Sequence, residues 1–66
     1  MPTPVNLNTA DAAQLAHLPG LTPSLAQRII AYRTAHGPFH RPEELLLVKG
    51  MTPTILAQTR PYLILP

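Results

Sequence analysis

LPGLTPSL at residues 18–25 is repeated in similar form as VKGMTPTI at residues 48–55, and this repeat is the strongest indication of the fold. The glycine, threonine and proline are identical in the two copies, and leucines of the first copy are replaced only by other apolar residues in the second. Glycine permits a sharp turn, threonine caps a helix, and proline suits the first helical position. Each copy therefore predicts a helix, a tight turn and a second helix.

The first of these helices has a capping signal of its own. Asn8 followed three residues later by Asp11 resembles a capping box, so we expect the helix to begin after Asn8 and to end near Ala16. The apolar side chains expected to face the core from this region are Ala12, Leu15 and Leu18.

The remaining helices have a proline near their starts. Thr22-Pro23 begins the second helix, which we expect to run to about Ala35 because Gly37-Pro38 then stops it. The third is expected over residues 42–50 and the fourth over residues 52–61. The inward stripe predicted for the second helix consists of Leu25, Ala26, Ile29, Ile30 and Tyr32.

The two ends of the predicted domain are expected to meet. Residues 62–65 follow Pro61 and favour an extended conformation, and we expect them to lie beside residues 5–7. The prolines of residues 1–4 indicate a flexible N-terminal segment, which leaves residues 5–66 as the domain.

Composition limits the classes of function. A chain of 66 residues with no cysteine makes one small core, without disulfides or a thiolate zinc site. Its apolar runs are much shorter than the roughly 20 residues of a membrane-spanning helix, so we expect no membrane contact by this segment. The net charge of +2 permits a polyanionic partner, but the basic residues are scattered. Any DNA site must therefore be assembled by the fold.

Catalysis and metal binding are not predicted. The carboxylates Asp11, Glu43 and Glu44 all lie in first helical turns, where they offset the helix dipole. His36 and His40 have the spacing of a helical metal pair, but glycine and proline interrupt the helix between them. We therefore expect a protein that is not an enzyme and that has neither a cofactor nor a metal.

A helix that begins directly after a tight glycine turn presents backbone N–H groups that lack partners within the helix, and these attract phosphate. Two such turns related by a pseudo-twofold axis would contact both strands of duplex DNA and read shape and charge. We expect the chain to act as a monomer on non-specific double-stranded DNA. The predicted phosphate-binding residues are Gly20, Leu21, Thr22, Gly50, Met51 and Thr52 through their amides, Ser24 and Thr54 through their hydroxyls, and Lys49 as the cation.

The stretch VNLNTADAAQLAHLPGLTPSLAQRIIAYR, with GPF, EELL, VKGMTP and RPYLIL after it, resembles the tandem helix-hairpin-helix domain of ComEA-type competence proteins. The resemblance covers Val5 to Leu65. It implies an all-α, SAM-like fold of four or five short helices that binds duplex DNA during natural transformation. It also implies a periplasmic or other extracytoplasmic location, membrane anchoring in a longer form, and contact with other uptake proteins.

The chain departs from the family turn at two pairs of positions. Thr22 and Thr52 replace a second glycine, and Ser24 and Thr54 replace lysines. Each threonine hydroxyl can cap its own helix, which removes a phosphate donor, or turn outward and donate to phosphate. Loss of the lysines predicts weak binding, toward the 10⁻⁴ M end of the roughly 10⁻⁴ to 10⁻⁶ M non-specific range. Arg28, Lys49 and Arg60 are the residues that could compensate.

A second resemblance belongs to another functional class. Similar NLNTA segments, followed by glycine, an apolar residue, threonine and proline, occur in the minor pseudopilin K subunits of type II secretion. There the helical repeats serve protein assembly. Under this alternative the turns only connect helices, and the partners are other secretion proteins.

Overall fold

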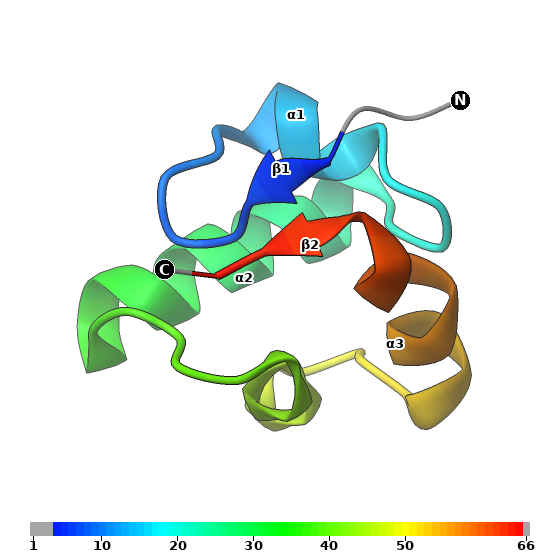
Figure 1. The fold of residues 1–66 in the computed structure, drawn as a ribbon. Helices are drawn as coiled ribbons and strands as arrows, with labels where there is room; N and C mark the ends of the chain where they lie inside the picture. Colours follow the sequence, from blue (N-terminus) through cyan, green and yellow to red (C-terminus); the bar gives the residue numbers. More distant parts are fainter. Residues whose placement is uncertain (1–3, 66) are drawn as a thin grey trace.

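Short helices and one pair of strands make up residues 4–65, the part of the chain that the computed structural model describes (Figure 1). In the view of Figure 1 the strands lie at the front, with α1 above them and α2 behind. Residues 1–3, most of the segment expected to be flexible, lie outside the described residues, as does Pro66. The elements are β1 (Val5–Asn6), α1 (Ala12–Ala16), α2 (Pro23–His36), the 3-10 helix η1 (Pro42–Leu47), α3 (Pro53–Thr59), the 3-10 helix η2 (Arg60–Tyr62) and β2 (Leu63–Ile64).

The predicted start of α1 was wrong by three residues. Asp11 is the N-cap, and its carboxylate accepts from the Gln14 amide at 2.8 Å while the Gln14 side chain accepts from the Asp11 amide at 3.0 Å. Asn8 is engaged elsewhere, because its carboxamide accepts from the Phe39 amide at 2.6 Å and donates to the Phe39 carbonyl at 2.9 Å. Asn8 therefore joins two distant loops and caps no helix.

α2 has the predicted bounds to within one residue. The Thr22 hydroxyl accepts from the Leu25 amide at 3.2 Å, and Pro23 occupies the first helical position. The helix ends at His36, and Gly37 follows with φ +90°. A helix stop that requires positive φ is a position for glycine.

The third predicted helix is shorter than expected and has 3-10 geometry. Glu44 N–H donates to the Arg41 carbonyl at 3.1 Å, and Val48 N–H donates to the Leu45 carbonyl at 3.0 Å. Leu45 of this segment and Val48, which caps its C-terminal end, are both buried. The segment ends at Leu47, before the turn at Gly50.

The predicted meeting of the chain ends takes the form of a parallel two-stranded sheet. Val5 pairs with Leu63 and Asn6 with Ile64, and the Leu7 amide donates to the Ile64 carbonyl at 3.0 Å. The domain is mostly helical, but because it contains this sheet the all-α prediction is only roughly correct. The sheet closes the domain by joining its first and last described segments.

The core forms between the two repeats. Leu15 and Leu18, expected to face inward, are buried, whereas Ala12, Ile30 and Tyr32 are only partly buried. Among residues 4–65 no helix is long and apolar enough to cross a membrane. The buried apolar residues are Leu7, Ala10, Leu15, Leu18, Leu21, Leu25, Ala26, Ile29, Phe39, Leu45, Val48 and Leu56.

Candidate nucleic-acid interface

The two glycine turns have matching hydrogen bonds. Gly20 has φ +85° and Gly50 has φ +94°. The amide that follows each glycine donates back across the turn at 3.1 Å, from Leu21 to the Leu18 carbonyl and from Met51 to the Val48 carbonyl. The sequence repeat is therefore also a repeat of backbone geometry. In Figure 1 both turns, cyan and yellow, lie toward the right-hand side of the domain.

Both threonines act as helix caps. The Thr22 hydroxyl accepts from the Leu25 amide at 3.2 Å, and the Thr52 hydroxyl accepts from the Ile55 amide at 3.1 Å. These contacts correspond to the first of the two alternatives that the sequence left open. The helix gains a cap, and one N–H group of its first turn becomes unavailable to an anion.

The predicted set of amide donors changes in consequence. Leu21 and Met51 were expected to offer their amides, but both donate inside their own turns. Other amides of the turns belong to exposed residues and find no acceptor among residues 4–65. Unsatisfied N–H groups at the start of a helix are the donors to which phosphate binds. These free amides belong to Gly20, Thr22 and Ser24 in the first turn and to Gly50, Thr52 and Thr54 in the second.

Each glycine lies against the second helix of the other repeat. A Cβ atom on Gly20 would lie 2.7 Å from Gln58 Oε1 and 3.4 Å from the Ile55 carbonyl oxygen of α3. A Cβ atom on Gly50 would lie 2.8 Å from Arg28 Nη1 and 3.0 Å from a Leu25 methyl group of α2. The two turns thus pack reciprocally, through residues 30 positions apart, which is the arrangement that an approximate twofold between the repeats produces.

The surroundings of the two turns differ in charge. The guanidinium of Arg28 donates to the Lys49 carbonyl at 3.3 Å, which places it beside the second turn. Arg28 and Lys49 are both exposed. The corresponding positions around the first turn hold Gln58 and Pro19, which carry no charge.

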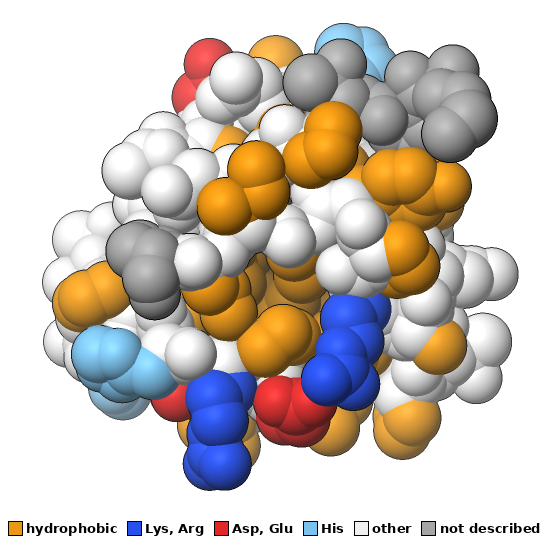
Figure 2. All heavy atoms as spheres, in the orientation of Figure 1, with side chains coloured by type: hydrophobic (Ala, Val, Ile, Leu, Met, Phe, Trp, Pro, Cys, Tyr) orange, Lys and Arg blue, Asp and Glu red, His pale blue; other side chains and the backbone are white. Residues whose placement is uncertain are grey.

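Arg60 has a different partner from the one expected. Its guanidinium lies 2.9 Å from a carboxylate oxygen of Glu43, and both side chains are about half exposed. Figure 2 shows basic and acidic side chains next to one another along the lower edge of the face that carries the strands. An exposed pair of this kind contributes at most about 1 kcal/mol to stability, and it places a negative charge beside the cation.

The carboxylates in the described residues have structural contacts. Asp11 caps α1, Glu43 pairs with Arg60, and Glu44 accepts from the His40 amide at 3.2 Å. Within residues 4–65 no group of three histidine or acidic side chains is arranged to hold a metal ion.

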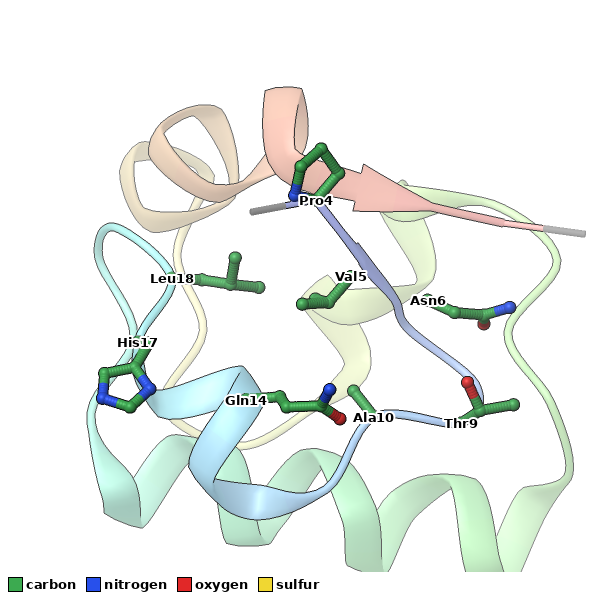
Figure 3. A pocket seen from close by; sticks show the side chains of 8 residues that line it. All are labelled: Pro4, Val5, Asn6, Thr9, Ala10, Gln14, His17 and Leu18. Carbon is green, nitrogen blue, oxygen red and sulfur yellow. The ribbon is translucent and has the colours of Figure 1, made fainter. Parts of the chain in front are cut away.

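A hollow of about 650 Å³ lies between β1 and α1 (Figure 3). Val5 and Leu18 point into it, and His17 lies at its edge. His17 is the titratable side chain among its described lining residues, and the rest of the lining is apolar or uncharged. The hollow adjoins the first turn through Leu18 but contains none of the free amides.

Comparisons with known proteins identify a family that is defined by helices joined through a hairpin turn. Residues 2–64 match the family described as the helix-hairpin-helix motif. The chain is 41% identical over 56 residues to Endonuclease/exonuclease/phosphatase family domain-containing protein 1 of Xenopus laevis and 43% identical over 56 residues to the Bos taurus protein of that name. Each alignment covers 85% of this chain and 10% of the relative.

A bacterial relative has a different name. Protein YhgF of Escherichia coli (strain K12) is 37% identical over 59 residues, which are 89% of this chain and 8% of YhgF. The chain therefore spans about a tenth of the length of the curated relatives it matches. Because the family match covers nearly all of the described residues, both turns included, the chain belongs to the helix-hairpin-helix motif family, whose motif is generally associated with nucleic-acid binding.

Proposed function

We propose that this chain binds double-stranded DNA through its phosphates, without sequence preference, using the two glycine turns as the contact surface. The observation that carries the proposal is that the same turn occurs twice, each time with amides of exposed residues that have no acceptor among residues 4–65. Backbone amides recognise phosphate oxygens and carry no information about base sequence. Membership of the helix-hairpin-helix family supports the same partner.

The chemistry of the turns predicts weak binding. Amide donors are neutral, and the cations at the turns are few, so only a small number of counterions would be released. The hydroxyls of Ser24 and Thr54 are exposed and can add hydrogen bonds to phosphate. We expect a dissociation constant near 10⁻⁴ M at physiological salt, the weak end of the usual non-specific range.

The test is fluorescence anisotropy with two labelled duplexes of unrelated sequence, each measured from about 50 to 200 mM salt. We expect equal affinities for the two duplexes and a linear fall of the logarithm of the binding constant with the logarithm of salt concentration. Lys49→Glu should weaken binding to both duplexes, while Arg41→Glu, at the other end of η1, is the control for net charge. Salt-independent binding, or unequal affinities for the two duplexes, would contradict the proposal.

The finer role that we propose is DNA uptake outside the cytoplasmic membrane. It is supported by the resemblance to ComEA-type competence domains from Val5 to Leu65. In a transformable host, deletion of the coding sequence should lower the amount of DNase-resistant DNA that cells acquire, and the parent sequence should restore it. Unchanged uptake would remove this role and leave DNA binding intact.

Protein assembly is the second candidate, and one observation favours it. Leu46 and Leu47 are adjacent on η1, and the two residues are 42% and 68% exposed. Adjacent exposed leucines are more typical of a protein contact than of a phosphate contact. If assembly is the function, Leu47→Glu should abolish capture of secretion-pilus components and Lys49→Glu should not.

A further inference from the structure

We propose that the second turn carries the cationic part of the DNA contact and that Arg28, contributed by the other repeat, is half of it. In this arrangement Arg28 and Lys49 form one phosphate-binding pair beside Gly50, and the first turn contacts DNA through neutral groups alone. The proposal rests on the proposed function and concerns how the two turns divide it.

The approximate twofold identifies the residues to compare. Residues 30 positions apart occupy the same place around the two turns, since Gln58 meets Gly20 as Arg28 meets Gly50. The residue before each glycine is Pro19 in the first turn and Lys49 in the second. One turn is thus bordered by two cations, and at the other both corresponding positions are uncharged.

The guanidinium of Arg28 is held in place and only partly used. Its Nη1 donates to the Lys49 carbonyl at 3.3 Å, which fixes the planar group next to the turn. A guanidinium has five N–H donors. Arg28 makes no other hydrogen bond within residues 4–65, so its remaining donors are available to a phosphate at the exposed surface. Arginine is suited to this role because its donors match two phosphate oxygens at once.

The surface around Arg28 leaves room for a ligand. A shallow hollow of about 420 Å³ on α2 is lined by Pro23, Ser24, Gln27 and Arg28. Ser24 carries one of the free amides of the first turn, so this hollow leads from the neutral turn to the cation of the charged one. A phosphate backbone that followed it would meet an amide and then a guanidinium, which lies beside the turn that contains Lys49.

The proposal predicts that substitutions at equivalent positions of the two turns change DNA affinity in opposite directions, because one position of each pair is charged and the other is not. Neutralising Arg28 or Lys49 should remove one phosphate contact, lowering affinity by a factor on the order of 3 to 10 and the salt slope by about 0.9. Adding a cation at Gln58 should raise affinity by a similar factor. A charge at an exposed position away from the turns should have little effect.

The experiment compares anisotropy titrations of the whole chain with one labelled duplex at several salt concentrations. The variants are Arg28→Gln, which copies the residue at the equivalent position, together with Lys49→Gln, Gln58→Arg and Arg41→Gln as the matched loss of one charge. Lys49→Gln keeps the backbone carbonyl that Arg28 uses, so it tests the pair even where Arg28→Gln loosens the fold. Circular dichroism spectra establish that each variant is folded.

We expect Arg28→Gln and Lys49→Gln to weaken binding and flatten the salt dependence, and Arg41→Gln to change neither. Equal losses in Arg28→Gln and Arg41→Gln would overturn the proposal, because net charge alone would then explain the effect. An unchanged affinity in Lys49→Gln would overturn it as well. A parent that does not bind the duplex would contradict the proposed function. A parent that binds, with variants that behave in either of the two ways above, would contradict this inference alone.

Discussion

The hydroxyl of Thr59 donates to the carbonyl of Pro19 at 2.7 Å and joins residues 40 positions apart. Thr59 is fully buried and is the buried polar residue of the described core. Its hydroxyl also lies 3.0 Å from the Ile55 carbonyl of its own helix. This contact fixes α3 against the first turn, so it supports the orientation of the whole candidate interface.

Removing this hydroxyl should destabilise the domain. Thr59→Val keeps the shape of the side chain but leaves the Pro19 carbonyl without its partner, which should cost about 1–2 kcal/mol. Urea unfolding followed by circular dichroism measures the loss. Thr59→Ser, which keeps the hydroxyl, is the control for the hydrogen bond, and a Thr59→Val variant as stable as the parent would show that the bond contributes nothing.

The two turn glycines should not tolerate alanine. Gly20 and Gly50 both have positive φ, and an added Cβ atom would come within 3.0 Å of the opposite helix in each case. We expect Gly20→Ala and Gly50→Ala each to lower the free energy of unfolding by more than about 1 kcal/mol. Denaturant midpoints check this, and values within about 0.5 kcal/mol of the parent would contradict the turn geometry described above.

Asn8 should be more sensitive to substitution than an ordinary loop residue. Asn8→Asp keeps the acceptor for the Phe39 amide but loses the donor to the Phe39 carbonyl and places a charge beside it. The expected cost is about 1–3 kcal/mol. Thermal unfolding of Asn8→Asp beside Thr9→Ser, its exposed neighbour, separates this effect from general loop sensitivity, and equal stability of the two variants would argue against the clamp.

The capping threonines should compete with DNA for amide donors. Thr52→Gly releases the Ile55 amide and should cost only a few tenths of a kcal/mol, since glycine is a tolerated cap. We expect affinity for duplex DNA to rise about twofold to tenfold, the value of one hydrogen bond. A fall in affinity would mean instead that the hydroxyl itself donates to phosphate.

Features that depend on contacts between residues close in sequence could be predicted, whereas features that depend on contacts between distant residues could not. The starts of α2 and α3 were predicted correctly, because a helix cap depends on contacts within one turn of chain. Thr22 and Pro23 mark the first start, and the matching residues of the second repeat mark the other. Asn8 looked like a cap because its side chain suits one, but its partner Phe39 lies 31 residues away. The 3-10 form of η1 was not predicted, because no local signal in residues 42–47 distinguishes it from an α-helix.

The same distinction between local and long-range contacts applies to the residues of the candidate site. The repeated turn identified Gly20 and Gly50 from the sequence, whereas the position of Arg28 beside Lys49 depends on how two repeats pack. The free amides could not be separated from the occupied ones of Leu21 and Met51 without the hydrogen bonds of the turn. A spacing of 30 residues indicates which positions are equivalent but does not show that each turn lies on the other repeat's helix.

Contact of DNA with the two glycine turns can be measured by titrating the ¹⁵N-labelled chain with a short DNA duplex and following the amide chemical shifts. Weak binding suits this measurement, because each amide moves continuously as DNA is added. We predict the largest shifts at the free amides of Gly20, Thr22, Ser24, Gly50, Thr52 and Thr54, and at the side chain of Arg28. Shifts confined to Leu46 and Leu47 or to the hollow beside β1, or no shifts at all, would show that DNA does not bind at the two glycine turns.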